Sequence, residues 1–337
     1  MSIAVLVTGG AGYIGSHVAK ALAAAGYTPV TYDNLVHGDP EFVRWGPLVE
    51  GDIADRDLVA ATLRRYRIEA VMHFAALIEV SHSMKDALAF FDTNVGGSIS
   101  LLRAAAEANV KSVVFSSSCA VYGPPHVLPI PEDHPCAPAN AYGASKLMVE
   151  GALHWAERVH GVRHASLRYF NAAGADPDGE IGEAHEPETH LIPRALAAAV
   201  GAETALHIYG DDWETEDGTC VRDYVHVSDL AEAHVLALNH LLAGGGSVTL
   251  NLGTGRGHSV RAIIDIVERV TGRAVLVETM ARRTGDSPAL VADPAKARAL
   301  LGWTPRRSGL NEIVTTAWRW HGRAAMPRPV RKLARGS

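Results

Sequence analysis

The stretch that decides the fold reads Thr8-Gly9-Gly10-Ala11-Gly12-Tyr13-Ile14-Gly15 and contains the pattern GxGxxG from Gly10 to Gly15. It follows an apolar run, Ile3 to Val7, that predicts a strand, and it opens a segment from Tyr13 to Ala25, ended by Gly26, that predicts a helix. Glycines in such a turn let the backbone approach a pyrophosphate, whose charge the free N–H groups at the helix N-terminus can hold. The stretch therefore predicts a dinucleotide-binding turn.

A carboxylate follows the next predicted strand, Pro29 to Tyr32. Asp33 lies about 20 residues beyond the glycines, which is the place where such a fold presents an acid to the adenosine ribose. A carboxylate accepts hydrogen bonds from the ribose diol but repels a 2′-phosphate, and the neighbouring Asn34 supplies no cation. The sequence therefore predicts NAD as the cofactor in preference to NADP.

Two further segments lie where a cofactor would pass the carboxyl ends of the strands. Asp52 and Ile53 follow a short strand and are expected at the adenine edge, although a solvated loop aspartate explains Asp52 nearly as well. Phe74, Ala75 and Ala76 close another strand with small residues, and core packing explains Phe74 equally well.

Short apolar runs alternate with helical patterns through the first half of the chain. Further strands are expected at Pro47–Glu50, Ala70–Phe74, Ser112–Phe115 and His164–Tyr169, and further helices at Leu58–Tyr66, Lys85–Asn109 and Asn140–His160. This βαβ rhythm predicts an α/β fold with a Rossmann-type, doubly wound parallel sheet.

The rhythm breaks after residue 173, where residues 174–188 are rich in Gly, Pro, Asp and Glu. We expect residues 1–173 to form an NAD-binding domain, to which the chain returns around 218–250 through an amphipathic helix, Ser228 to Leu242. Residues 174–337 are expected to form mainly a smaller C-terminal α/β lobe that binds the substrate, with a mobile tail at 326–337.

Composition excludes several classes of protein. A length of 337 residues suits two lobes, and 47% hydrophobic with 20% charged residues is typical of a packed enzyme. The net charge of −6 argues against nucleic-acid binding, and the sequence has no apolar stretch long enough to span a membrane and no export signal, so we expect a cytoplasmic protein.

The cysteines and histidines do not indicate a metal site. Cys119, Cys136 and Cys220 are too widely spaced for a zinc or redox motif, and we expect no metal. His73 and His226 lie in apolar runs and are expected to be core imidazoles.

Tyr142 and Lys146 stand four residues apart on a predicted helix, so they share one face. A nearby ammonium favours the phenolate and makes tyrosine a base for a hydroxyl proton, while a serine at the end of the strand before it, such as Ser118, can hold the same oxygen. By itself the pair could be structural. Beside an NAD turn, it indicates a site that oxidises an alcohol.

The chain resembles the extended short-chain dehydrogenase/reductase superfamily and, within it, the UDP-glucose 4-epimerases. The resemblance spans nearly the whole chain and rests on the phrases VTGGAGYIGSH, YDNL, SSSCAVYG, YGASK, RYFNAAGA, ETHLIP, DGTCVRDYVHVSDLA, NLGTGRGHSV and RRTGD. It implies a homodimer, a catalytic trio of Ser118, Tyr142 and Lys146, and a UDP-sugar as substrate. The cofactor contacts that we expect from the residues and the resemblance together are Gly9, Gly12, Tyr13, Ile14, Gly15, Asp33, Asn34, Leu35, Asp52, Ile53, Phe74, Ala75, Ala76, Asn94, Ser116, Tyr142, Lys146 and Phe170.

The resemblance also implies which residues bind the substrate: Ser118, Tyr142, Asn171, Leu191, Tyr209, Arg222, Arg283, Asp286 and, at the sugar, Leu290. The residue types agree, because two guanidiniums can clamp a diphosphate and a tyrosine ring offers a flat face to a uracil. Two positions depart from relatives: Ile78 stands where several carry a lysine that contacts the cofactor ribose, and Cys119 where alanine is usual.

Two other functions fit the same fold. Nucleotide-sugar dehydratases that resemble this chain carry an acidic pair just after the Ser/Thr of the fifth strand, where Cys119 and Ala120 stand here, and decarboxylases share the same turn and Tyr/Lys pair. A noncatalytic NAD-sensing protein commonly lacks the catalytic Tyr or Lys, and both are present here. The sequence therefore favours C4 epimerisation of UDP-glucose and UDP-galactose, with weaker activity on UDP-N-acetylhexosamines.

Overall fold

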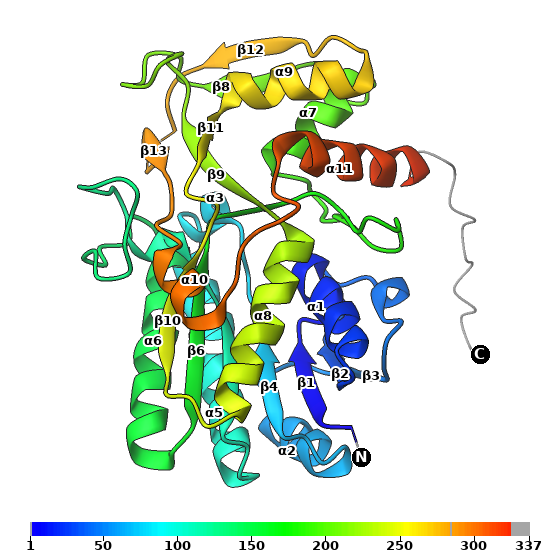
Figure 1. Cartoon of the computed structure of the whole chain (residues 1–337), viewed down its shortest axis with the longest axis vertical. Coiled ribbons are helices and arrows are strands. Elements are labelled where there is room, and N and C mark those ends of the chain that lie inside the picture. Colours follow the sequence, from blue (N-terminus) through cyan, green and yellow to red (C-terminus); the bar gives the residue numbers. More distant parts are fainter. Residues whose placement is uncertain (1, 284, 325–337) are drawn as a thin grey trace.

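The computed structural model describes residues 2–283 and 285–324, so the tail expected to be mobile lies outside the described residues. A seven-stranded, all-parallel sheet forms the larger lobe (Figure 1). In spatial order its strands are β10 (Val248–Leu252), β6 (Arg163–Tyr169), β5 (Ser112–Ser118), β4 (Ala70–His73), β1 (Ala4–Thr8), β2 (Thr28–Asp33) and β3 (Leu48–Glu50). The expected doubly wound α/β fold is confirmed.

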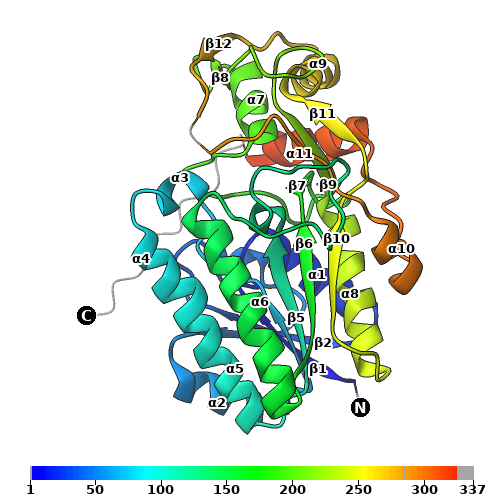
Figure 2. The same cartoon turned by 90° about the vertical axis from the view of Figure 1, so that its left-hand side faces the viewer.

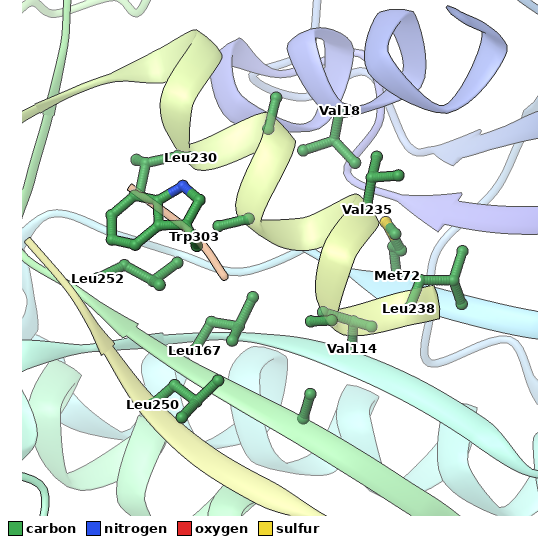
Figure 3. Packing of buried hydrophobic residues seen from close by; sticks show 14 of the residues in the cluster. Val18, Met72, Val114, Leu167, Leu230, Val235, Leu238, Leu250, Leu252 and Trp303 are labelled. Carbon is green, nitrogen blue, oxygen red and sulfur yellow. The ribbon is translucent and has the colours of Figure 1, made fainter. Parts of the chain in front are cut away.

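Helices cover both faces of this sheet (Figure 2), and each face has its own apolar cluster. One face carries α1 (Tyr13–Ala24), α8 (Val227–Leu242) and the short α10 (Ala295–Leu301); the other carries α2 (Arg56–Arg65), α5 (Gly97–Glu107) and α6 (Ala141–His160). Figure 3 shows the first cluster, in which Trp303 packs between Leu230 and Leu252. The Trp303 indole N–H also donates to the carbonyl of Asp229 at 2.9 Å, so this buried ring ties the C-terminal segment to α8.

The expected helix at Lys85–Asn109 differs in detail. A short helix, α3 (Val80–Ser83), precedes it, and the helix itself runs through α4 (Ala87–Phe90), a π-helical turn (Phe91–Gly96) and α5. Periodicity in the sequence does not reveal such a turn, which inserts a residue into the helical ladder and is frequent at functional sites. Likewise β5 extends to Ser118, beyond the expected Phe115, because its three serines continue the parallel pairing with β6.

The smaller lobe contains a four-stranded sheet in which β9 (Val221–His226) pairs with β11 (Gly257–Ser259), β13 (Ala289–Leu290) and β7 (Asn171–Ala173). A two-stranded sheet joins β8 (Leu206–Tyr209) to β12 (Val277–Met280). Helices α7 (Leu191–Ala199), α9 (Val260–Thr271) and α11 (Leu310–Ala324) enclose its core. Two 3-10 turns, Pro40–Phe42 and Cys119–Val121, complete the described elements.

The chain passes between the lobes several times, since β7 enters the smaller sheet directly after β6 and β10 returns to the larger one. Among the described residues, no helix has both the length and the apolar character needed to cross a bilayer.

Candidate active site

A cavity of about 1150 Å³ lies where the parallel strands end and the smaller lobe begins. Segments that follow β1, β2, β4, β5 and β6 line one side of it. The other side is lined by α7, β8, Arg283, residues 285–287 and Leu290. The strand order reverses between β1 and β4, and ligands of open α/β sheets bind at such a switch point.

The glycine turn takes the shape that a pyrophosphate requires. Gly9 has a φ of +70°, and a Cβ there would lie 2.6 Å from the backbone nitrogen of Ala75. A Cβ on Gly15 would lie 2.2 Å from the carbonyl oxygen of Gly9, so the first turn of α1 can approach the loop only without a side chain. No side chain caps the N-terminus of α1, and its N–H groups remain available to an anion.

Asp33 is fixed at the end of β2 with 7% of its surface exposed. Its carboxylate accepts the N–H of Ala11 at 3.0 Å and that of Leu35 at 2.9 Å. Burial raises the pKa of Asp33, and these two N–H groups oppose the rise. Beside it, Asn34 donates to the Asp52 carboxylate at 2.9 Å, so the residue next to Asp33 is joined to the aspartate expected at the adenine edge.

Tyr142, Ser118 and Lys146 converge from α6 and the end of β5. The Asn140 side chain caps α6 by accepting the N–H of Gly143 at 2.8 Å, which fixes the turn that carries Tyr142. Lys146 is 2% exposed, donates to the Ser116 carbonyl at 2.8 Å and lies 5.7 Å from the centre of the Tyr142 ring. The side chains of the proposed trio therefore occupy one small region.

The electrostatics of this trio differ from the simple expectation. Burial raises the pKa of Tyr142 to about 12, although a hydrogen bond with Ser118 opposes the rise. Burial also lowers the pKa of Lys146 to about 7, because desolvation disfavours its ammonium. Burial therefore opposes both the phenolate of Tyr142 and the ammonium of Lys146, in contrast to the expectation that a nearby ammonium favours the phenolate.

Three of the expected cofactor residues do not line the cavity: Leu35, Asn94 and Lys146. Asn94 is 2% exposed, and its amide accepts the Leu77 N–H at 2.7 Å and donates to the Leu77 carbonyl at 3.0 Å and to Ser145 at 3.0 Å. It therefore holds the loop after β4 against α6. The other expected cofactor residues all line the cavity.

The expected substrate residues line the other end of the same cavity. The Arg283 guanidinium lies 4.1 Å from the centre of the Tyr209 ring, and its Nε donates to Asp286 at 3.3 Å. Arg222 reaches the other oxygen of Asp286 at 3.8 Å. Asn171, Leu191 and Leu290 border the same space. Tyr209 comes from β8, Arg222 from β9, and Arg283 and Asp286 from the segment between β12 and β13. Together these two guanidiniums, a carboxylate and an aromatic face form a site suited to a nucleoside diphosphate.

A family model described as the NAD dependent epimerase/dehydratase family matches residues 5–253. The chain belongs to this family. It is 52% identical to a UDP-glucose 4-epimerase of Rhizobium leguminosarum bv. trifolii over 95% of this chain and 98% of the relative.

Two solved structures share this epimerase/dehydratase architecture. A UDP-glucose 4-epimerase from Brucella ovis in complex with NAD gives a TM-score of 0.93 at 53% identity, covering 95% of this chain and 99% of that one. The UDP-Glc/GlcNAc 4-epimerase of Campylobacter jejuni gives 0.84 at 36% identity, covering 96% and 100%.

Reasoning from the sequence missed a cluster of acidic and imidazole side chains, of which Glu183 and His190 line the cavity. Glu183, Glu188 and His190 bring carboxylate and imidazole atoms within 4.8 Å of one another, a spacing at which a metal ion could be held. Their own contacts already satisfy them, since His190 Nδ1 lies 2.7 Å from Glu188. Burial lowers the pKa of His190, but the two carboxylates outweigh this and raise it, as expected for an ion pair. The sequence could have pointed to this cluster, because Glu188 and His190 both lie in the phrase ETHLIP.

The two histidines expected in the core are buried. His73 is 2% exposed and is held by Thr8 at 2.7 Å and Ser98 at 2.8 Å, and His226 is fully buried. Burial lowers the pKa of His73 to about 3. Both imidazoles are therefore neutral core groups, as expected.

Proposed function

We propose that this chain inverts the C4 configuration of UDP-glucose and UDP-galactose reversibly, using a resident NAD. The observation that carries the proposal is a single cavity that joins the glycine turn and Asp33, the catalytic candidate Tyr142, and the two arginines at its far end. Lys146 lies behind Tyr142, with its ammonium 5.7 Å from the centre of that ring. The cofactor site, the proton-transfer group and the diphosphate site are therefore contiguous, and a nucleotide sugar held by its diphosphate at one end extends toward the nicotinamide at the other.

The roles follow from the geometry. NAD supplies the group that takes up and returns the C4 hydrogen with its electron pair. Tyr142 removes the proton of the 4-hydroxyl group and later returns it, while Ser118 holds the same oxygen. Lys146, anchored on the Ser116 carbonyl, orients this pair. The 4-keto sugar that forms must turn before the return step, so the UDP half is bound firmly and the sugar loosely.

The lobes divide these tasks. Residues 1–173, with the return of the chain around 218–250, hold NAD, and residues 174–337 supply most of the UDP-sugar site. Arg222 lies on β9, which falls within the return expected at 218–250 but pairs with the strands of the smaller sheet. Arg222 therefore reaches the substrate end from the smaller lobe, and the return to the larger sheet begins after β9.

The site has no base for the elimination of water that a dehydratase catalyses, at the two positions after Ser118 where dehydratases carry an acidic pair. Cys119 follows Ser118 directly, and burial raises the pKa of its thiol to about 12, so it stays protonated. Ala120 beside it has no ionisable group. A dehydratase must remove the C5 proton here, and neither residue can do so.

A direct test uses the purified protein with UDP-galactose and no added NAD. UDP-glucose should appear in the NMR spectrum, and denatured protein should release NAD in near-stoichiometric amount, mostly oxidised. A 4-keto-6-deoxy product would support a dehydratase. No conversion with bound NAD would support a noncatalytic NAD-sensing protein, and bound NADP would contradict the role of Asp33.

Leu290 should set the preference between plain and N-acetylated sugars. It lines the cavity and packs against the cluster that contains Phe170 and Ile130. Its side chain lacks the ring and hydroxyl of tyrosine and leaves room near C2, so UDP-N-acetylglucosamine should be epimerised less efficiently than UDP-glucose but measurably. An apolar pocket discriminates by only about 1 to 3 kcal/mol for a modest change in bulk.

The variant Leu290→Tyr decides this question. Activity on the acetylated pair should fall relative to the plain pair when both are measured by NMR, and Leu290→Val, which keeps an apolar surface, serves as the control. If the ratio of the two activities stays unchanged in Leu290→Tyr, Leu290 only packs against its neighbours.

The chain is proposed to act in the cytoplasm as a homodimer. Apolar side chains form one stripe on the outer face of α6, Met148, Trp155 and Val159 (51%, 61% and 66% exposed), beside Leu88 and Ile99 of the α4–α5 helix (73% and 39%). Figure 2 shows α5 and α6 side by side with this face uncovered. An exposed apolar patch of this kind marks an interface. Sedimentation should give the mass of two chains, and Trp155→Glu should give one.

A further inference from the structure

Two consecutive arginines, Arg282 and Arg283, leave the end of β12 and stack on two different aromatic rings. The Arg283 guanidinium lies 4.1 Å from the centre of the Tyr209 ring, in the cavity. The Arg282 guanidinium lies 4.2 Å from the centre of the Trp213 ring, and Arg282 does not line the cavity. Arg282 therefore lies outside the site that Arg283 helps to form.

Arg282 makes contacts that join two loops. Its Nε donates to the Asp212 side chain at 2.7 Å, and its Nη2 donates to the Asp212 carbonyl. Trp213, beneath the same guanidinium, donates its indole N–H to the carbonyl of Tyr209 at 3.0 Å. The Arg282–Trp213 stack is thus hydrogen bonded to the backbone of Tyr209. The ring of Tyr209 lines the substrate end of the cavity.

Gly210 shows how closely these groups are fitted. It has a φ of +85°, and a Cβ there would lie 2.5 Å from Nε1 of Trp213 and 2.7 Å from Cγ of Arg282. Its N–H donates to the carbonyl of Met280 at 2.8 Å, the last contact of the β8–β12 pairing. Only a glycine allows the indole and the arginine stem to close over this turn.

The described residues after Arg283 are held toward β9 by Arg222. Its guanidinium donates to the Ser287 carbonyl at 2.9 Å and lies 3.8 Å from Asp286. Arg283 is 57% exposed and is followed at 285 by a glycine with a φ of +88°, and the next described backbone contact to β9 comes from Pro288, which accepts the N–H of Val221. Among the described residues between Met280 and Pro288, Arg282 ties this segment to the loop after β8 through Asp212 and Trp213.

We propose that Arg282 is a positioning residue that, with Trp213 and Asp212, clamps the β8 and β12 loops together and thereby holds Tyr209 and Arg283 ready for the nucleoside diphosphate. The inference rests on the proposed function for the identity of the ligand. An exposed ion pair alone contributes little. We expect a larger effect here because several contacts act together. The Arg282–Trp213 stack, the two hydrogen bonds from Arg282 to Asp212 and the bond from Trp213 to Tyr209 hold both loops in one arrangement. The loops then need not lose conformational entropy when the ligand binds.

The test measures UDP binding by calorimetry and UDP-galactose kinetics on the NAD-loaded protein. Arg282→Ala should weaken UDP binding and raise KM by about tenfold, with kcat and bound NAD nearly unchanged. Arg282→Lys keeps the charge but not the planar stack, so it should recover only part of the loss. Trp213→Phe keeps the aromatic face and should retain more affinity than Trp213→Ala.

Arg307→Ala is the matched control, since Arg307 is 48% exposed and pairs with Glu312 in the same lobe, compared with 43% exposure for Arg282. It should leave UDP binding and KM unchanged. Equal UDP affinity in wild type and Arg282→Ala would overturn the positioning role, as would a loss confined to kcat. Failure of the wild-type protein to bind UDP at all would instead contradict the proposed function.

Discussion

Replacing Tyr142 by phenylalanine should lower turnover of UDP-galactose by about 10²- to 10⁴-fold, the range that a positioned acid–base group contributes. The phenol of Tyr142 hydrogen bonds with Ser118 and is the group of the trio that can carry the substrate proton. Phenylalanine keeps the ring and its packing on α6, so UDP affinity should change little. Turnover measured by NMR and UDP binding measured by calorimetry separate the two effects.

The control for this variant is Tyr122→Phe, which removes a hydroxyl from the same lobe. Tyr122 is fully buried and hydrogen bonds with Asn251 at 2.7 Å and with Arg168 at 3.0 Å, away from the cavity lining. It should lose stability while keeping turnover near that of the wild type. A Tyr142→Phe protein with wild-type turnover would remove Tyr142 from its role as base.

Replacing Glu150 by alanine should lower the free energy of unfolding by about 3 to 5 kcal/mol, the effect of breaking one side of a buried ion pair. Glu150 on α6 accepts two hydrogen bonds from Arg168 on β6, at 2.9 and 2.6 Å, and one from Ser117 on β5 at 2.5 Å. Burial opposes the charge of Arg168, but the contacts with Glu150 outweigh it and raise its pKa. Alanine would leave this guanidinium buried without its partner.

Urea unfolding, followed by circular dichroism, measures the loss. The double variant Glu150→Leu/Arg168→Met should recover much of it, because it removes both charges and fills the space with apolar groups. Arg56→Ala breaks an exposed pair with Glu107 and should have little effect. If Glu150→Ala unfolds at the same urea concentration as the wild type, the pair does not stabilise the fold as we expect.

The sequence by itself determined the cofactor end of the molecule. The glycine turn, the carboxylate of Asp33 and the alternation of strands and helices depend on local properties: a positive φ at Gly9, an uncapped helix N-terminus, and the periods of strand and helix. Residues within about 30 positions of one another form this unit, so neighbouring sequence is enough to predict it. The four-residue spacing of Tyr142 and Lys146 likewise fixes their common helix face.

Only the tertiary structure decided how the substrate end of the cavity is assembled and how burial shifts the pKa of Tyr142. Tyr209, Arg222 and Arg283 come from β8, β9 and the segment after β12, and their meeting depends on sheet pairings between segments that are distant in the chain. Burial then raised the pKa of Tyr142, where the sequence alone favoured the phenolate, because desolvation depends on every atom packed around the phenol. The position of a side chain also depends on contacts with residues that are distant in the sequence, which local sequence does not encode. The Asn94 amide binds the backbone of Leu77 away from the cavity, and Arg282 stacks on Trp213.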